Sequence, residues 1–307
     1  MSGNRRLPRH ASGRRPAVPF LPSAARDRLV IELGVTLPSG GDDFSRERMA
    51  RVAELARELG YQHVWAGEHL VTDSATADRG KSLDPFVTLA WVAGRVEGIA
   101  IGTSIVLLSM HHPFRVAREA ATLQLLSGGR FNLGIGVGWN EVEFRLSGYG
   151  FHDRGDRVDE ALRVIEALWS RKASFQGKFW SFDDAFFYPH PESRPQIWIG
   201  GNSARALARA RRHGDVWHPN GLPDGVFASV KDGWEGRIVP RVPVVFDREV
   251  GDPYTVSGSE EAIAARLNRA LAAGADGFLL CFEGDDGGIA EMRRFAREIT
   301  PRLRELR

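Results

Sequence analysis

The sequence predicts an α/β protein that folds as one (β/α)8 barrel of the TIM type, on three observations. Short β-branched and apolar runs alternate with longer stretches of helical period, and eight such pairs can be counted. The 307 residues suffice for one barrel, whose usual length is about 250 residues. Apolar residues make up 43% and charged residues 26%, as in ordinary globular domains. An open doubly wound sheet is the alternative that the same alternation allows.

Eight segments are predicted as strands because each is short and rich in β-branched or aromatic residues. They cover residues 31–37, 63–66, 99–107, 131–137, 196–199, 215–217, 242–246 and 278–282. The sixth is the weakest, because it is only three residues long.

The predicted helices have recognisable ends. In the first, Met49, Val52 and Ala56 recur at helical spacing, and Gly60 follows as a left-handed stop. The second opens with Asp84 as N-cap and a proline at the first helical position, where its missing N–H costs nothing. Further helices are predicted at residues 113–126, 156–169, 203–213, 225–234, 259–273 and 289–303.

One segment, residues 173–195, interrupts the alternation. It carries seven aromatic residues and is predicted as an insertion, folded as a hairpin, between the fourth helix and the fifth strand. Aromatic side chains at this density favour a role in covering a barrel end or a subunit interface, and lining a substrate site is the alternative.

The remaining features of the composition concern location and partners. Residues 1–28 are predicted to be a flexible tail rich in Arg and Pro, ahead of a single domain over residues 29–307. Lys plus Arg number 41 against 39 Asp plus Glu, so charge gives no reason to expect nucleic acid as a partner. Nowhere do 18 apolar residues run together, and Cys281 stands alone. We therefore expect a cytoplasmic protein without membrane spans or intrachain disulfides.

In a β/α barrel the loops after the carboxyl ends of the strands build the active site. Glu68 and His69 follow the second strand, and an imidazole has the side-chain pKa closest to neutrality. The pair is the candidate for proton donation or uptake; the alternative is that His69 caps a helix or packs against Trp65. His111 and His112 are adjacent, so their side chains diverge, and no metal site is expected.

Glycine-rich segments follow the fourth and fifth strands. Gly134, Gly136 and Gly138 alternate along one face of the fourth strand, where a flat ring could approach the backbone. No crossover helix follows at once, so a dinucleotide fingerprint is not predicted. Residues 200–203, Gly-Gly-Asn-Ser, precede a helix whose free N–H groups suit a phosphate, and a plain helix cap is the alternative.

Read in order, four segments resemble the luciferase-like monooxygenase superfamily, especially its F420-dependent oxidoreductases. They are GTSI at residues 102–105, AATLQLLSGGR at 120–130, LGIGVGW at 133–139 and PQIWIGG at 195–201. The resemblance extends over residues 31–303 and implies a β/α barrel with the cofactor at its carboxyl end.

The resemblance also implies roles for individual residues. Ser104–Ile105 falls where a non-prolyl cis peptide supports the cofactor ring, and Glu68 and His69 contact the cofactor and assist catalysis. Residues 200–203 match the phosphate-binding loop. The expected cofactor-binding residues are Ser104, Ile105, Gly136, Gly138, Trp139, Gly200, Gly201, Asn202 and Ser203.

The chemistry implied is hydride transfer between coenzyme F420 and a small organic substrate. An FMN-dependent monooxygenase supplied by a flavin reductase is the alternative, and a non-catalytic cofactor-binding protein is the second. Asp73 replaces a tryptophan that sugar-phosphate dehydrogenases of this family carry, and Trp139-Asn140-Glu141 stands where their acid is expected. Glucose 6-phosphate is therefore not the expected substrate. A homodimer is expected, because relatives often form one.

Overall fold

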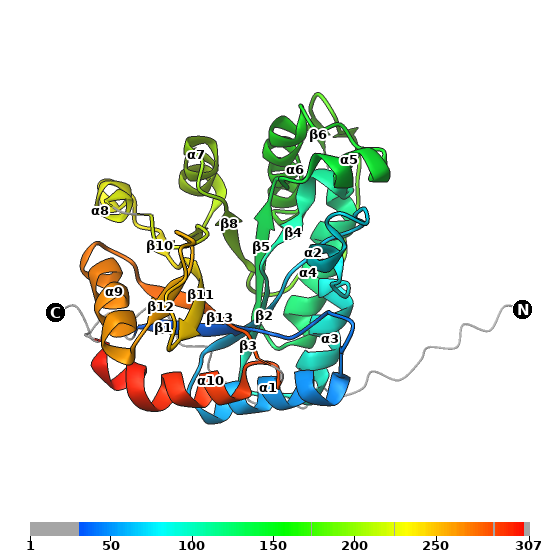
Figure 1. The fold of residues 1–307 in the computed structure, drawn as a ribbon. Coiled ribbons are helices and arrows are strands. Elements are labelled where there is room, and N and C mark those ends of the chain that lie inside the picture. The colour runs from blue at the N-terminus through cyan, green and yellow to red at the C-terminus, as the bar shows by residue number, and fades with distance from the viewer. Residues whose placement is uncertain (1–30, 173, 224, 285, 304–307) are drawn as a thin grey trace, which may run out of the picture.

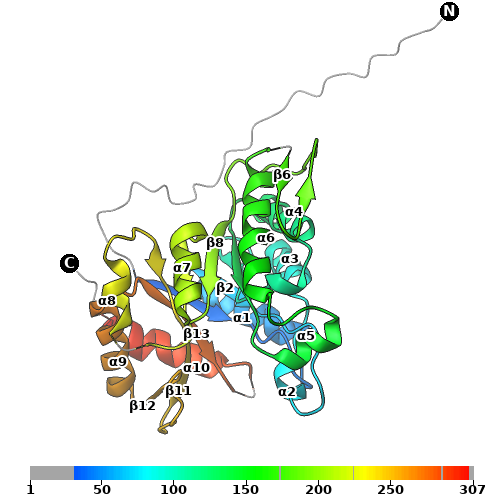
Figure 2. The same cartoon turned by 90° about the horizontal axis from the view of Figure 1, so that it is seen from above.

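The computed structural model describes residues 31–303 except residues 173, 224 and 285, so the predicted tail lies outside the described residues. Helices surround a curled parallel sheet (Figure 1). In the view of Figure 2, α3, α4 and α6 lie on one side of the sheet and α8 and α9 on the other.

The sheet contains the eight predicted strand positions, the third of them as two shorter pieces. Its strands are β1 (Glu32–Thr36), β2 (His63–Ala66), β3 (Ala100–Thr103), β4 (Val106–Leu107), β5 (Phe131–Gly136), β8 (Gln196–Gly200), β9 (Val216–His218), β10 (Arg237–Ile238), β11 (Arg241–Phe246), β12 (Val256–Gly258) and β13 (Gly277–Phe282). Their order is β10-β9-β8-β5-β3-β2-β1-β13-β11-β12, with β4 beside β5.

The two ends of this order are joined by one stretch of chain. Only Val239 and Pro240 separate β10 from β11. The Val239 N–H donates to the carbonyl of Trp217 of β9 at 3.0 Å, and the Leu279 N–H of β13 donates to the carbonyl of Pro240 at 2.9 Å. The stretch is therefore bonded to β9 on one side and to β13 on the other, and the sheet curls in the manner of a TIM barrel.

The helices between the strands are α1 (Arg46–Glu58), α2 (Ala77–Gly80), α3 (Pro85–Arg95), α4 (Pro113–Leu126), α5 (Glu141–Ser147), α6 (Arg154–Trp169), α7 (Ala204–His213), α8 (Val226–Lys231), α9 (Glu260–Ala272) and α10 (Ile289–Arg294). Two predicted ends are confirmed: Asp84 accepts from the Val87 N–H at 2.8 Å, and Gly60 has a φ of 83°.

Some predicted boundaries are wrong. The helix expected over residues 289–303 ends as α10, and a π turn (Phe295–Ile299) and a 3-10 turn (Thr300–Arg302) follow it. Pro301 lies in the last turn and has no N–H with which to continue a helix. The third predicted strand is interrupted between β3 and β4, where the Ser104–Ile105 peptide bond is cis. The short elements α2, α5, β10 and β12 were not predicted.

An antiparallel hairpin, β6 (Phe175–Gln176) and β7 (Ser181–Phe182), lies between α6 and β8. Glu160 of α6 holds it, because its carboxylate accepts the N–H groups of Lys178, Phe179 and Trp180 at 2.7–2.8 Å. Burial raises the pKa of Glu160, but these three hydrogen bonds outweigh it and leave the pKa below its ordinary value.

The buried core has two parts within the barrel, and a third cluster of Leu107, Met110 and Phe144 lies beyond them. The larger part fills the space between the helices and the outer face of the sheet. A separate inner cluster contains Trp65, Trp198, Val216, Val239 and Leu279. Val64 and Ala66, on either side of Trp65, belong to the outer part, so alternation along the strand directs the Trp65 indole to the inside of the curl. The indoles of Trp65 and Trp198 lie 4.4 Å apart, centroid to centroid.

Candidate active site at the carboxyl ends of the strands

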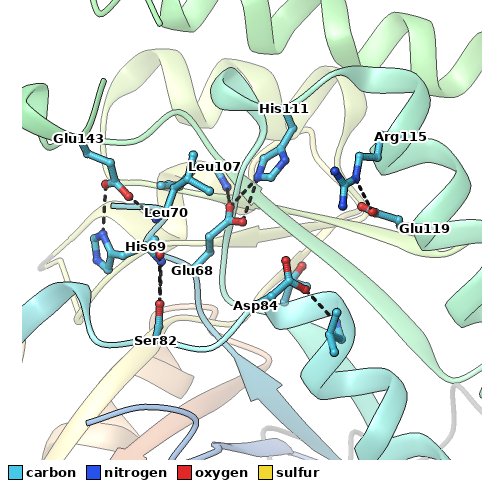
Figure 3. Close-up of polar contacts among 12 residues, drawn as sticks. Glu68, His69, Leu70, Ser82, Asp84, Leu107, His111, Arg115, Glu119 and Glu143 are labelled. Atoms are coloured by element: carbon cyan, nitrogen blue, oxygen red, sulfur yellow. Dashed lines mark hydrogen bonds and ion pairs between the residues drawn. The ribbon is translucent and has the colours of Figure 1, made fainter. Parts of the chain in front are cut away.

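His69 follows β2, and an acid from a distant part of the chain orients its imidazole (Figure 3). Nδ1 lies 3.1 Å from Oε2 of Glu143, which is 74 residues later on α5. The other oxygen of Glu143 accepts the Leu70 N–H at 2.5 Å, so the carboxylate is held from two sides. The Glu143 side chain is 1% exposed and that of His69 is 23% exposed. Because an ionised carboxylate only accepts, Nδ1 carries a proton and Nε2 is left for proton exchange.

Glu68 points away from His69 and joins the end of β2 to β4. Its carboxylate accepts the Leu107 N–H at 2.7 Å and lies 2.9 Å from Nε2 of His111. Burial disfavours the charged form of His111, but the hydrogen bond and charge of Glu68 outweigh it and raise the pKa of His111. Glu68 does not orient the His69 imidazole, because the two adjacent side chains diverge. Glu143 takes that role.

Glu143 is the residue that sequence reasoning missed. The resemblance implies an acid in the loop directly after the fourth strand, where this chain has Trp139, Asn140 and Glu141. Asn140 caps α5 by accepting the Val142 N–H at 3.1 Å, and this short helix brings Glu143 back toward His69. A capping asparagine followed by an acid in the first turn is the signal that could have indicated it.

The Ser104 hydroxyl contacts His218 of β9. Sequence reasoning also missed His218 as a site residue. Nδ1 of His218 lies 2.5 Å from the carbonyl of Val239, and its Nε2 lies 2.9 Å from the Ser104 hydroxyl. Since a carbonyl only accepts, Nδ1 carries the hydrogen and Nε2 accepts from Ser104. Burial lowers the pKa of His218 to about 4. The imidazole is therefore neutral at neutral pH and fixes the direction of the Ser104 hydroxyl.

The face formed by the glycines of β5 is not open to a flat ring, and that expectation is wrong. A Cβ on Gly134 would lie 1.8 Å from the carbonyl oxygen of Thr103, and one on Gly136 would lie 1.9 Å from Cδ1 of Ile105. These glycines give room to the neighbouring strand. Gly138 has a φ of 75°, and Trp139 after it is 56% exposed with its ring 6.4 Å from the His69 ring. Cofactor contacts at Gly136, Gly138 and Trp139 stay predictions.

Residues 200–203 form a rigid turn before α7. Gly201 has a φ of 112°, and a Cβ there would lie 3.2 Å from that of Ala206. Ser203 caps the helix by accepting the Ala206 N–H at 3.1 Å. Asn202 exchanges two hydrogen bonds with the backbone of Asn220, at 2.8 and 2.7 Å. The side chains of the turn are thus engaged in holding it, and the first N–H groups of α7 have no partner within the helix.

The described residues form neither a metal site nor a membrane-spanning helix. In residues 31–303, outside the three gaps, no three His, Cys, Asp or Glu side chains are grouped so that they could hold a metal ion. None of the helices over the same residues is long and apolar enough to cross a membrane.

The fold and the acid-oriented histidine at the carboxyl ends of the strands define a class of barrel oxidoreductases. The family described as luciferase-like monooxygenase matches residues 29–237, and the chain belongs to it. This family contains F420-dependent and flavin-dependent oxidoreductases.

Relatives of both cofactor types are similar to the chain. The F420-dependent hydroxymycolic acid dehydrogenase of Mycobacterium tuberculosis is 31% identical over 188 residues, which are 60% of this chain and 52% of that protein. The oxygenase component of the flavin-dependent trigonelline monooxygenase of Acinetobacter baylyi is 27% identical over 172 residues, 55% of this chain and 46% of that protein. The chain thus matches about half the length of these relatives.

Solved structures show the same fold. The monooxygenase RslO1 from Streptomyces bottropensis has a TM-score of 0.75 and 22% identity, and the match covers 88% of this chain and 99% of that one.

Proposed function

We propose that the chain is an oxidoreductase that transfers a hydride between coenzyme F420 and a small organic substrate. The observation that carries the proposal is the His69–Glu143 pair, in which a buried carboxylate orients a part-exposed imidazole at the end of the sheet where barrel active sites lie. The similarity to an F420-dependent dehydrogenase supports it.

The residues at this end of the sheet fit a ring cofactor that carries a phosphate. The positive φ of Gly201 forms the turn that leads into α7, and the amino end of α7 favours an anion. We assign the phosphate to residues 200–203 and the ring to Ser104, Ile105 and Trp139. Ser104 can present its hydroxyl oxygen as an acceptor, since its hydrogen is directed to His218.

When bound, the deazaflavin supplies or takes up the hydride. The protein has to move one proton, and His69 is placed to do so at Nε2. Glu143 holds the imidazole in the required tautomer and stabilises the imidazolium once Nε2 is protonated. A positioned acid or base of this kind contributes a factor of about 10² to 10⁴ in rate.

Titration of the purified protein with F420 and, separately, with FMN tests the proposal. We expect F420 to bind and to be reduced or oxidised in the presence of substrates from a panel of alcohols, ketones and enones. Binding of FMN alone would favour the monooxygenase alternative, which the flavin-dependent relative also supports. Binding of F420 without turnover of any panel member would favour a non-catalytic protein, and binding of neither cofactor would contradict the proposal.

A further inference from the structure

Two arginines on one strand differ in how their charge is balanced. Arg237 of β10 and Arg241 of β11 are four residues apart on one continuous stretch. Ile238 and Val242 belong to the outer core, and Val239 belongs to the inner cluster. Alternation therefore directs both arginine side chains to the inside of the curl, Arg237 toward the amino ends of the strands and Arg241 toward the carboxyl ends.

Arg237 is fully compensated within the chain. It forms an ion pair with Glu32 of β1, and its second nitrogen donates to Oε1 of Gln196 at 2.5 Å. Glu32 also lies 3.1 Å from Nε2 of His63. Burial raises the pKa of Glu32, but His63 and Arg237 outweigh it and lower the pKa. This carboxylate is therefore ionised and balances the guanidinium.

Arg241 has no such partner: in the part of the chain that the structure describes, no ion pair joins it to an Asp or a Glu. Its contacts are neutral. One nitrogen donates to Oδ1 of Asn220 at 3.3 Å, and the guanidinium interacts with the thiol of Cys281. The side chain is part-buried. A part-buried guanidinium without a counter-charge is less stable than a paired one, so it gains from an anionic ligand.

The strand order places Arg241 across the sheet from the expected cofactor ring. Three strands separate β11 from β3 in one direction (β13, β1 and β2), and three separate the continuous β10 from β3 in the other (β9, β8 and β5). Ser104 follows β3, so Arg241 and Ser104 lie on opposite walls. His218 lies between them, since its Nε2 contacts Ser104 and the charge of Arg241 adds to burial in lowering its pKa.

The proposed phosphate-binding turn, residues 200–203, has no free side-chain group on the side of Arg241. Both polar atoms of the Asn202 amide are engaged by the backbone of Asn220, and the Asn220 side chain accepts from Arg241. Alternation along the strand directs the Arg241 side chain to the interior of the carboxyl end, where a substrate would lie between Arg241 and the cofactor. A guanidinium presents its donors as a planar fork that matches the two oxygens of a carboxylate.

We propose that Arg241 binds a carboxylate of the substrate, so that the enzyme acts on small organic acids whose reacting carbon faces the cofactor and His69. This proposal rests on the proposed function, because the reaction requires the bound cofactor. Recognition of the acid depends on Arg241 itself.

The test uses matched pairs of an acid and its neutral amide: benzoate and benzamide, 4-oxopentanoate and 4-oxopentanamide, and lactate and lactamide. Their binding is measured with the apo protein by thermal shift and with the cofactor-loaded protein by the change in cofactor absorbance. We expect at least one acid to bind about tenfold or more tightly than its amide. Arg241→Met should abolish this preference, and Arg241→Lys should keep part of it, because lysine retains the charge without the fork.

Arg269→Met is the matched control, because Arg269 is an exposed arginine of α9 for which no ion pair is seen among the described residues. It should leave the preference intact. Equal binding of acids and amides by the parent protein, absence of binding by every acid, or a preference that survives Arg241→Met would each overturn the proposal. A weaker cofactor affinity in Arg241→Met would also overturn it, because Arg241 would then bind the cofactor phosphate.

The two proposals fail separately. If the parent protein binds neither F420 nor FMN, the proposed function fails, whereas the acid preference is still read from the thermal shift of the apo protein.

Discussion

Polar groups occur at both ends of the curled sheet, and the two ends differ in whether those groups are satisfied within the chain. At the amino end, Glu32, His63, Gln196 and Arg237 bind one another, and Trp65 donates its indole N–H to His63. At the carboxyl end, Nε2 of His69 and the guanidinium of Arg241 have no charged partner among the described residues. A closed network holds the barrel together, and an open one is available to ligands. This agrees with the general division of β/α barrels into a stabilising and a catalytic face.

The largest expected effect concerns His69. His69→Ala and His69→Gln should each lower turnover by about 10² to 10⁴, because neither side chain exchanges a proton near neutrality. Cofactor affinity and melting temperature should stay close to those of the parent. Single-turnover measurements with saturating cofactor check this. Glu143→Gln, which keeps the shape but not the charge, should give a smaller loss, and an unchanged hydride-transfer rate in all three variants would remove the pair from the mechanism.

The second prediction concerns His218, in the layer between the two ends. Its pKa is lowered from 6.5 to about 4, so the unfolded chain takes up a proton below pH 6.5 that the folded protein resists. The stability due to the neutral imidazole is complete above pH 6.5 and declines as pH falls, by about 3 kcal/mol at pH 4 and below. Denaturant unfolding of the parent and of His218→Gln, followed from pH 7 to pH 4, measures the difference. A variant whose stability falls as steeply as that of the parent would contradict the assignment.

At the amino end, Glu32→Gln should reduce stability with little effect on turnover per folded molecule. The substitution leaves Arg237 without its counter-charge. Loss of one partner of a buried pair costs about 3–5 kcal/mol, and because the Arg237 side chain is 35% exposed we expect about 2 kcal/mol.

Glu47→Gln on the surface is the control for this comparison. Its side chain is 70% exposed beside Arg46, so the change in unfolding free energy should be negligible. A Glu32 variant with parental stability and reduced turnover would reverse the roles given to the two ends.

The smallest expected effect is that of Gly201→Val on cofactor affinity. A side chain at a φ of 112° strains the turn, and its Cβ would approach Ala206, so the dissociation constant should rise about tenfold. Gly233→Val is the matched control, since Gly233 also has a positive φ but has nothing within 4 Å of the added Cβ. Equal affinities in the parent and Gly201→Val would reject the phosphate assignment, provided that the variant is folded.

Local patterns in the sequence were sufficient for most elements of the fold. The eight strand positions, the N-cap at Asp84 and the stop at Gly60 were all predicted, because each depends on backbone preferences and hydrogen bonds within a few residues. The same local reasoning placed a helix across Pro301 and joined β3 to β4, because periodicity alone does not mark where a strand or helix is interrupted.

The sequence by itself determined the alternation of strands and helices, the family, and the candidate role of His69. Only the tertiary structure decided which acid orients that histidine, which glycines give room to neighbouring strands, and which of two similar arginines keeps an uncompensated charge. The physical reason is that these properties depend on pairings between residues far apart in the chain. His69 and Glu143 are 74 residues apart, and Glu32 and Arg237 are 205 apart. Such pairs meet only once the order and curl of the strands have brought their ends together.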